Sequence, residues 1–324
     1  MHETIFSPLA IAPMIDWTNS PFRVFMRLLA PQALLYTEMQ TTGAIQNNPK
    51  RALAFQACEH PIALQLGGSD PQALAAAAIL AEEQGYDEIN LNLGCPSDRV
   101  QAGRFGACLM TEGQLVAQCI KAMKEVVSIP VTAKTRIGID QQDSYVFFKD
   151  FAQQLIDAGC QKLIVHARKA WLRGLNPKQN RTIPPVHYEY AYRIKQDFPE
   201  IPVIINGNIT QIDAIHDHLQ QVDGVMLGRL ACDNPFRIAE IHAALYPHLP
   251  QTSRIAVYSQ YLAFAHEQLT QGVPISLLLK PLYTLTHGLA GASQWKKRLM
   301  QVMQTKQFAL MNDLSDYLAE LEEG

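Results

Sequence analysis

The chain has 324 residues, of which 48% are hydrophobic and 18% charged, so it can bury a large core and is too long for one small domain. It has no run of eighteen uninterrupted apolar residues and no basic N-terminal segment followed by an apolar run, so we expect a cytoplasmic protein without a membrane span. The six cysteines lie far apart with no C-x-x-C pair, so we expect free thiols and no metal site.

The formal net charge of −3 is unevenly distributed along the chain. Residues 307–324 contain five carboxylates and no base, and without these carboxylates the rest of the chain carries +2. Within that rest, residues 166–181 (HARKAWLRGLNPKQNR) have five bases, no acid and a tryptophan among the bases. This composition fits a nucleic-acid surface and also fits solvated loop charges, so charge alone does not decide between the two.

The first 230 residues or so repeat one pattern, in which a short β-rich apolar run is followed by a loop and an amphipathic helical stretch. Eight such runs occur, at residues 9–14, 33–39, 61–68, 88–94, 130–136, 162–168, 202–208 and 223–229. Alternating β and α units predict a parallel sheet, and eight of them predict a closed (β/α)8 TIM barrel of the α/β class. An open doubly wound sheet is the alternative, but the turn APMIDWT after the first run lacks the glycine fingerprint of that fold.

The clearest predicted helix follows the third run. Asp70 is its N-cap, Pro71 lies in its first turn, and Gly85 follows its end. From about Ser253 the β/α alternation stops, and helical patterns follow one another to the C-terminus. We therefore expect a catalytic barrel at residues 1–248 that binds the cofactor, followed by a smaller all-helical domain at residues 249–324.

Polar residues cluster at the C-terminal ends of the predicted strands, which is where barrels of this kind carry their chemistry. In chain order they are Glu38, Gln65, Asn90, Asn92, Cys95, Lys134, Arg136, His166, Arg168 and Asn206. A single lysine or histidine in a strand is usually a surface or core residue. The joint placement of these residues favours one active site at the mouth of the barrel.

The last two predicted strands add a candidate phosphate site. Their ends read INGNI and MLGRL, and glycines at these ends expose the backbone N–H groups that such barrels use to hold phosphate. A phosphate site beside Lys134, Gln65 and His166 matches the needs of a flavin mononucleotide, whose ring requires hydrogen-bond partners and a cation for its negative charge. Other phosphate-bearing ligands would use the same residues.

Several blocks resemble the tRNA-dihydrouridine synthases, which are flavin enzymes that reduce uridines in the D-loop of tRNA. The resemblance extends from about Pro8 to Arg229, and the blocks that carry it are APMIDWT, LLYTEMQTTGAI, ALQLGGSDP, EINLNLGCPSDRVQAGRFGACLM, VTAKTRIGID and HARKAWLRGLNPKQNRTIPP. Within the family, the basic stretch at residues 166–181 resembles the A type, which acts on positions 20 and 20a.

The resemblance implies FMN as cofactor, NADPH as electron donor and the D-loop of tRNA as partner. The implied FMN contacts are Ala12, Pro13, Met14, Gln65, Lys134, His166, Asn206, Gly207, Asn208, Gly228 and Arg229. Asn208 departs from the family, where many members have glycine or an acid at this position. A phosphate contact through the backbone of Asn208 tolerates this change, whereas a contact through its side chain would not.

The resemblance also implies that Cys95 is the proton donor. Reduction of the uracil C5=C6 bond needs a hydride from the flavin and a proton from the opposite face of the base. A cysteine with an ordinary pKa of about 8.5 stays protonated at neutral pH and is therefore an acid. Pro96 ends the strand and, with Gly94, fixes the turn that carries the thiol. We expect the other five cysteines to be small buried hydrophobic residues.

A uridine inside folded tRNA must swing out to reach the flavin, at a cost of a few kcal/mol that contacts to the RNA backbone must offset. The predicted tRNA contacts are Asn92 at the uracil edge, Arg99 and Arg104 beside the active loop, Lys169, Arg173, Lys178 and Arg181 in the basic stretch, and Lys296, Lys297 and Arg298 in the helical tail. We expect the protein to be a monomer.

Two other interpretations use the same residues. A different FMN barrel enzyme acting on a small free pyrimidine or an enone would share Lys134 and the phosphate site, but it would need neither a basic loop nor a helical tail. A non-catalytic RNA-binding barrel would bind no flavin and would be colourless when purified.

Overall fold

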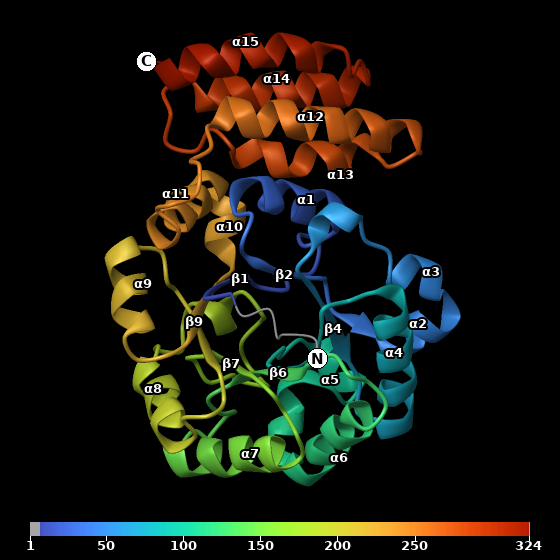
Figure 1. Ribbon diagram of the computed structural model, residues 1–324, viewed down its shortest axis with the longest axis vertical. Coiled ribbons are helices and arrows are strands. Elements are labelled where there is room, and N and C mark those ends of the chain that lie inside the picture. Colours follow the sequence, from blue (N-terminus) through green and yellow to red (C-terminus); the bar gives the residue numbers. More distant parts are fainter. Residues whose placement is uncertain (1–6, 324) are drawn as a thin grey trace. The chain divides into compact units, whose positions relative to one another are not determined.

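The structure is a computed structural model that describes residues 7–323, and its centre is a sheet of parallel strands (Figure 1). The strands of the closed barrel are β1 (Leu9–Ile11), β2 (Leu34–Tyr36), β4 (Ile62–Gly67), β5 (Glu88–Leu93), β6 (Val131–Arg136), β7 (Leu163–His166), β8 (Val203–Asn206) and β9 (Gly224–Leu227). Each predicted run contains one of these strands, so the eight predicted strands are confirmed.

The strands pair in the order β2, β1, β9, β8, β7, β6, β5, β4, and a further pairing between β2 and β4 closes the ring. At this closure Tyr36 lies opposite Ala63 in parallel register. The closed ring of eight parallel strands confirms the TIM barrel. The short strand β3 (Gln40–Thr41), which pairs with the end of β4, was not predicted.

The barrel interior has an apolar side and a polar side. The apolar side is one cluster of buried residues: Ala10, Ala12, Leu34, Tyr36, Ala63, Ile164, Ile204 and Met226. On β5 and β6 the buried side chains of Glu88, Asn90 and Thr132 are polar instead. Because side chains two apart on a strand share a face, Asn92 and Lys134 continue this polar side toward the strand ends.

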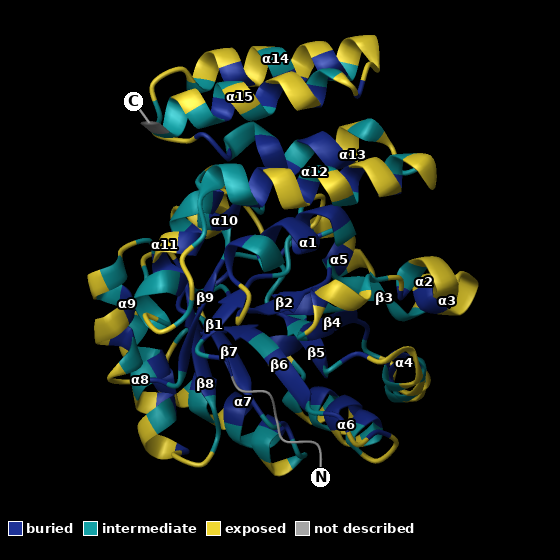
Figure 2. Cartoon of the chain, turned by 45° about the horizontal axis from the view of Figure 1, so that its top comes forward, coloured by how far each residue is buried: buried dark blue, intermediate teal, exposed yellow. Residues whose placement is uncertain are grey.

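Helices follow the strands and lie around the ring (Figures 1 and 2). The longer ones are α4 (Pro71–Gln84), α6 (Gly113–Lys124), α7 (Tyr145–Asp157), α8 (Tyr188–Asp197) and α9 (Ile212–Leu219). The shorter ones are α2 (Thr42–Asn47), α3 (Pro49–Ala52), α5 (Asp98–Ala102), η2 (Gly106–Thr111) and η3 (Gln179–Arg181).

Helix α4 begins and ends as its sequence predicts. Asp70 Oδ1 accepts a hydrogen bond of 2.7 Å from the backbone N–H of Ala73, and Pro71 is the first helical residue. Gly85 ends the helix at φ 97°, in the left-handed region where glycine is favoured.

The described chain divides into two compact units, each with its own contacts. The first comprises residues 7–15, 34–55 and 60–227 and contains the barrel strands with the helices named above. The second comprises residues 16–33, 56–59 and 228–323. Its elements are α1 (Ser20–Leu29), η1 (Ala57–Glu59), α10 (Arg229–Asp233), α11 (Pro235–Leu245), α12 (Arg254–Thr270), α13 (Ile275–Leu279), η4 (Lys280–Thr284), α14 (Ala292–Thr305) and α15 (Leu310–Glu323).

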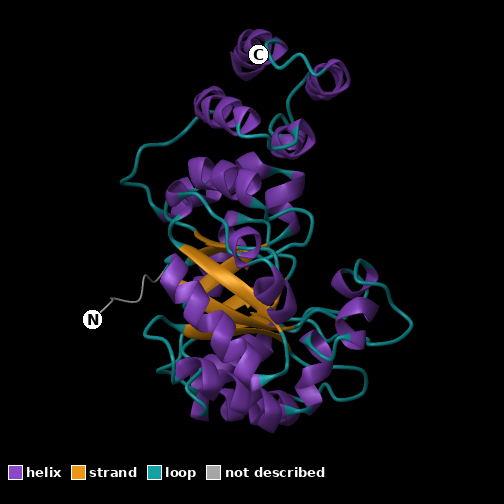
Figure 3. Ribbon diagram, turned by 90° about the vertical axis from the view of Figure 1, so that its right-hand side faces the viewer, coloured by secondary structure: helices purple, strands orange, loops and turns teal. Residues whose placement is uncertain are grey.

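The second unit has its own aromatic core, and the C-terminal part of this unit consists of helices joined by loops, as Figure 3 shows. Trp295 is fully buried, donates from Nε1 to the carbonyl of Leu282 at 2.8 Å, and meets Tyr258 edge to face at 5.4 Å. Phe25 of α1 and Tyr261 of α12 form a second edge-to-face pair at 5.3 Å.

The acidic C-terminal segment is part of this packing. Both carboxylate oxygens of Glu322 accept backbone N–H groups at the start of α12, from Arg254 at 2.7 Å and Ile255 at 3.0 Å. A carboxylate at a helix N-terminus satisfies otherwise unpaired N–H groups and complements the helix dipole.

The two compact units are defined by contacts within the chain and not by function. The expected division into a catalytic domain and a helical domain between residues 248 and 249 therefore stays a prediction. No helix among residues 7–323 is long and apolar enough to cross a membrane.

Candidate active site

Cys95 lies in a tight turn directly after β5 and is half-buried. The backbone N–H groups of Gly94 and Cys95 donate to Asn92 Oδ1 at 3.1 and 3.0 Å, and the carbonyl of Cys95 accepts from Ala107 at 2.9 Å. Gly106 has φ 77°, and a Cβ there would lie 2.6 Å from the Cys95 carbonyl oxygen. The turn is thus fixed on both sides and leaves the thiol partly accessible, with Sγ 3.6 Å from Ser97 Oγ.

Arg136, at the end of β6, ties this turn to the basic stretch. Its Nε donates to the carbonyl of Gly94 at 2.9 Å, and its Nη1 donates to the carbonyls of Lys169 and Asn180 at 3.0 and 2.9 Å. Burial lowers the pKa of Arg136 to about 10, which leaves it protonated at neutral pH. The side chain therefore acts as a charged clamp between two loops.

Lys134 lies two residues earlier on β6 and faces Asn92 in the neighbouring strand. Its Nζ donates to Asn206 Oδ1 at 3.3 Å, and Asn206 Nδ2 donates to the carbonyl of Met226 at 2.7 Å. Burial, and secondarily the charge of Arg136, lower the pKa of Lys134 to about 7. An anionic group beside Nζ would favour the charged ammonium, so the site is suited to an anionic ligand.

Gln65 is only 1% exposed and lies between two asparagines of β5. Its Nε2 donates to Asn90 Oδ1 and its Oε1 accepts from Asn92 Nδ2, both at 2.8 Å. These bonds use one hydrogen of each amide nitrogen, so Gln65 and Asn92 each keep a second amide hydrogen outside the two bonds.

The end of β8 carries the predicted phosphate loop. Gly207 has φ 131°, and a Cβ there would lie 3.1 Å from the His166 ring. Asn208 is exposed and has φ 57°, a left-handed conformation that asparagine and glycine tolerate best. The left-handed backbone at this position therefore suits the asparagine found there. Tyr188 holds the loop by donating to the carbonyl of Gly207 at 2.6 Å.

The remaining predicted cofactor residues lie at the ends of β1 and β9. Ala12 is buried and donates its N–H to the carbonyl of Leu227 at 2.8 Å, whereas Pro13 and Met14 are half-buried. Gly228 and Arg229 belong to the second compact unit, where Gly228 precedes α10 and Arg229 is its exposed first residue.

The basic stretch after β7 is a compact loop held by a buried asparagine. Asn180 is 0% exposed, accepts the N–H of Trp171 at 2.8 Å, and donates to the carbonyls of Trp171 and Leu175 at 2.9 and 3.1 Å. Lys169 forms an ion pair with Asp143 at 2.6 Å and lies 4.4 Å from the Trp171 ring centroid.

The predicted tRNA contacts differ in how accessible they are. The exposed ones are Arg99, Arg104, Arg173, Lys178, Arg181, Lys296 and Lys297. Arg104 reaches Glu112 at 3.1 Å, and Arg298 lies over the Tyr317 ring at 4.0 Å. The structure thus gives Lys169, Arg104 and Arg298 partners of their own within the protein.

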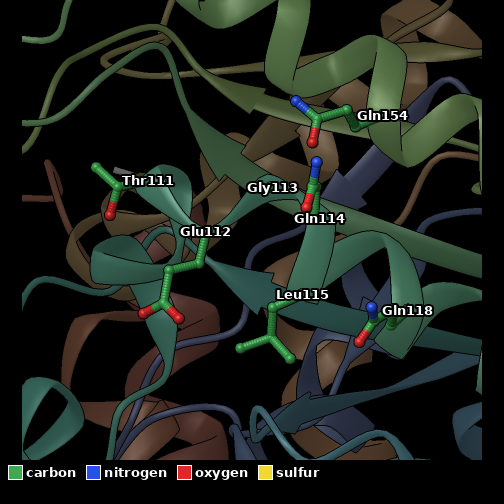
Figure 4. Close-up of a pocket in the computed structure, with 7 residues that line it drawn as sticks. All are labelled: Thr111, Glu112, Gly113, Gln114, Leu115, Gln118 and Gln154. Carbon is green, nitrogen blue, oxygen red and sulfur yellow. The ribbon is translucent and has the colours of Figure 1, made fainter.

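A depression of about 480 Å³ lies at the start of α6 and is shown in Figure 4. Its lining residues are Thr111, Glu112, Gly113, Gln114, Leu115, Gln118 and Gln154, and none of them is a predicted site residue. Within residues 7–323 no three histidine, cysteine, aspartate or glutamate side chains are grouped as a metal site.

Three buried polar residues of the site were missed in the sequence: Glu88, Thr132 and Asn180. A signal was present for the first two, because Glu88, Asn90 and Asn92 alternate along one strand that otherwise reads as apolar, as do Thr132 and Lys134 on the next. Asn180 carries no comparable signal, since its role depends on backbone groups brought together only by the fold.

Comparison with known proteins gives consistent matches. The model of the family described as Dihydrouridine synthase matches residues 10–322. Proteins named tRNA-dihydrouridine(20/20a) synthase are similar along 90% of this chain. Those from Yersinia pestis and Shewanella oneidensis are each 50% identical, and the match covers 85% and 88% of them. The one from Salmonella typhi is 51% identical, with 89% of it covered.

Among solved structures, a 2-naphthoyl-CoA reductase complex superposes with a TM-score of 0.55 at 10% identity. The match covers 72% of this chain and half of that one. At this identity the likeness concerns the fold alone.

Proposed function

The chain belongs to the dihydrouridine synthase family, whose flavin-dependent members reduce uridine in tRNA to dihydrouridine, and we propose that it acts on positions 20 and 20a of the D-loop. The observation that carries this proposal is the identity of about half of all residues, along 90% of the chain, with relatives named for those two positions. We further propose that the protein works as a monomer in the cytoplasm, where tRNA is available.

We propose FMN as the flavin and NADPH as its reductant. The residues at the strand ends fit FMN in three respects. Gly207 presents backbone where a side chain would crowd His166, Lys134 supplies a cation whose pKa burial has lowered, and Gln65 has an amide hydrogen outside its internal bonds. When bound, the flavin supplies the hydride that reduces the uracil double bond.

In this proposal the protein contributes binding, orientation and one proton. Cys95 delivers the proton from Sγ to the uracil carbon on the face away from the flavin. Asn92 points its second Nδ2 hydrogen at a uracil carbonyl while its Oδ1 holds the Cys95 turn. Lys134 stabilises negative charge at the ring, and Gln65 orients the ring edge.

We propose that the exposed bases of the loop after β7, Arg173, Lys178 and Arg181, bind tRNA phosphates, together with Arg99 and the tail residues Lys296 and Lys297. Lys169, Arg104 and Arg298 have partners within the protein, so they would have to exchange these for phosphate. Their expected contribution to tRNA affinity is therefore smaller than that of exposed Arg173 and Lys178.

The test is reduction of an unmodified tRNA transcript by the purified protein with NADPH. We expect dihydrouridine at positions 20 and 20a and at no other uridine. Dihydrouridine elsewhere in the transcript would contradict the proposed positions. Turnover of free uridine at a rate equal to that of tRNA would support an enzyme for small pyrimidines, and a colourless protein that binds no added flavin would support a non-catalytic RNA-binding barrel.

A further inference from the structure

A continuous line of hydrogen bonds crosses the polar side of the barrel interior, from a buried ion pair to the Cys95 turn. Its members, in order, are Lys162, Glu88, Thr132, Asn90, Gln65, Asn92 and the backbone N–H groups of Gly94 and Cys95. The side chains between the ion pair and Asn92 are at most 4% exposed. The bonds from Glu88 to the turn measure between 2.6 and 3.1 Å.

The groups at the ion-pair end of the line determine which atom donates and which accepts in each of its hydrogen bonds. The Thr132 hydroxyl lies 2.6 Å from Glu88 Oε1 and 3.2 Å from the carbonyl of Ile89, and both of these oxygens only accept. The Thr132 hydroxyl therefore donates its single hydrogen to one of them and must accept from Asn90 Nδ2 at 2.9 Å. The amide of Asn90 is thereby oriented with Oδ1 toward Gln65.

The backbone N–H groups at the turn determine the same donor and acceptor roles independently. Two backbone N–H groups point at Asn92, so the atom facing them must be Oδ1, and Nδ2 must face Gln65. Gln65 then accepts from Asn92 at Oε1 and donates to Asn90 from Nε2. A flip of any one of the three amides would set oxygen against oxygen or NH₂ against NH₂.

We propose that Glu88, Thr132 and Asn90 are positioning residues, which act through this line to hold Gln65 and Asn92 in one amide orientation and Cys95 in its turn. The inference rests on the proposed function in taking Cys95 as the proton donor. It adds that the buried charge pair of Glu88 and Lys162, at the far end of the line, contributes to the geometry of the reaction.

Loss of the Thr132 hydroxyl is expected to change the Cys95 turn through successive changes in amide orientation. In Thr132→Val the Nδ2 group of buried Asn90 loses its acceptor, and an unpaired buried donor is costly. A flipped Asn90 would face Gln65 with NH₂, and Gln65 would flip in response. Asn92 would then lose either its bond to Gln65 or its bonds to the turn. The Cys95 turn loosens although no atom next to it has changed.

The test compares two substitutions of Thr132 that keep different halves of the side chain. Valine keeps the methyl group and the shape, whereas serine keeps the hydroxyl. The first measurement is hydrogen exchange of the Gly94 and Cys95 amides in the flavin-loaded protein. We expect exchange roughly tenfold faster in Thr132→Val and close to wild type in Thr132→Ser. A packing role would reverse this order, since serine loses the methyl group.

The second measurement is the rate at which tRNA oxidises the pre-reduced enzyme. We expect Thr132→Val to slow this step by between about 10- and 100-fold, because small displacements of a reacting group have effects of this size. Asn90→Leu interrupts the line one step nearer the turn and is expected to give the same result, which covers the case in which the valine variant does not fold.

Tyr36→Phe is the matched control. The Tyr36 hydroxyl donates to the same oxygen of Glu88 at 2.8 Å but is a side branch of the line. We expect a lower melting temperature for this variant, with exchange at the turn and the tRNA rate unchanged.

Unchanged exchange at the Cys95 turn in both Thr132→Val and Asn90→Leu would overturn the proposal. Faster exchange with an unchanged tRNA rate would also overturn it, because the line would then be structural only. Failure of the proposed function looks different. It appears as a wild-type enzyme that tRNA does not oxidise, and the exchange measurement still decides whether the line orients the turn.

Discussion

The Cys95 thiol lies in a turn fixed by Asn92 and Ala107, so removal of its sulfur changes chemistry more than packing. We expect Cys95→Ala to keep its fold and flavin and to be reduced by NADPH as fast as wild type, because that step involves no uracil proton. Oxidation of the reduced enzyme by tRNA should slow by about 10²- to 10⁴-fold, which is the usual contribution of a positioned acid. Stopped-flow absorbance of the flavin measures both half-reactions.

Two control variants sharpen this prediction. Cys95→Ser should resemble the alanine variant, since a hydroxyl is a far weaker acid than a thiol. Cys108→Ser changes a cysteine 13 positions further along the chain that the proposed chemistry does not use, and both half-reactions should be unaffected. The expectation that the other five cysteines are buried was wrong for this one, which is half-buried, and for Cys58, which is exposed; Cys119, Cys160 and Cys232 are buried as expected. A Cys95→Ala enzyme that tRNA oxidises at the wild-type rate would mean that another group delivers the proton.

The lowered pKa of Lys134 predicts how the free energy of unfolding depends on pH. Burial lowers its pKa in the folded protein from 10.5 to about 7, so between these values the unfolded chain binds more protons than the folded one. The free energy of unfolding of the flavin-free protein should therefore rise with pH from about 7 to about 10, relative to Lys134→Met, in urea titrations across this range. A difference between the two proteins that does not change with pH would show that Lys134 is not desolvated.

The loop after β7 presents Arg173, Lys178 and Arg181 to solvent while Asn180 holds its backbone. Neutralising the three bases with glutamine should weaken tRNA binding and flatten its dependence on salt. The slope of log K against log salt should fall by about 0.7 to 0.9 for each phosphate that the protein no longer neutralises. Binding measured at several salt concentrations gives this slope.

A matched control changes the same number of charges elsewhere. Lys50, Arg51 and Lys121 are exposed on α3 and α6, outside the loop. Their replacement with glutamine should leave the salt slope closer to wild type than the loop variant does. Equal slopes for the two triple variants would place the RNA on another surface or make the effect one of net charge.

The strands were predictable because parallel barrel strands are buried on both faces and read as short apolar runs. The residues at which the strands end were less predictable. The second run was expected to reach Met39, but β2 ends at Tyr36 and the chain resumes pairing at β3, whose two residues carry no pattern. The conformation of the basic loop was not predictable either, since it depends on contacts of Asn180 with carbonyls inside the loop and of Arg136 with carbonyls distant in sequence.

Within the candidate site, the sequence indicated which residues lie at the strand ends but not how they are bonded. Gln65 and Asn92 were expected to face ligands, and the structure shows Asn92 donating to Gln65, which in turn donates to Asn90. Amide orientation depends on what lies at both ends of a hydrogen-bond line, and no periodicity encodes that. The roles of these residues toward cofactor and tRNA stay predictions.

The protein as a whole should carry one flavin mononucleotide per chain. Purified protein is expected to be yellow, and the flavin released on denaturation should elute as FMN in chromatography. Lys134→Ala should lose flavin or show a lower reduction potential, because the stabilising cation is gone. Release of FAD, or a lysine variant with unchanged flavin content and potential, would contradict these assignments.

The most direct test of the central claim is a map of dihydrouridine in total tRNA from cells that lack this protein. We predict loss of dihydrouridine at positions 20 and 20a with other sites unchanged, restoration by the wild-type chain, and no restoration by Cys95→Ala at equal protein level. Dihydrouridine that persists at both positions in the absence of the protein, or that Cys95→Ala restores in full, would contradict the account.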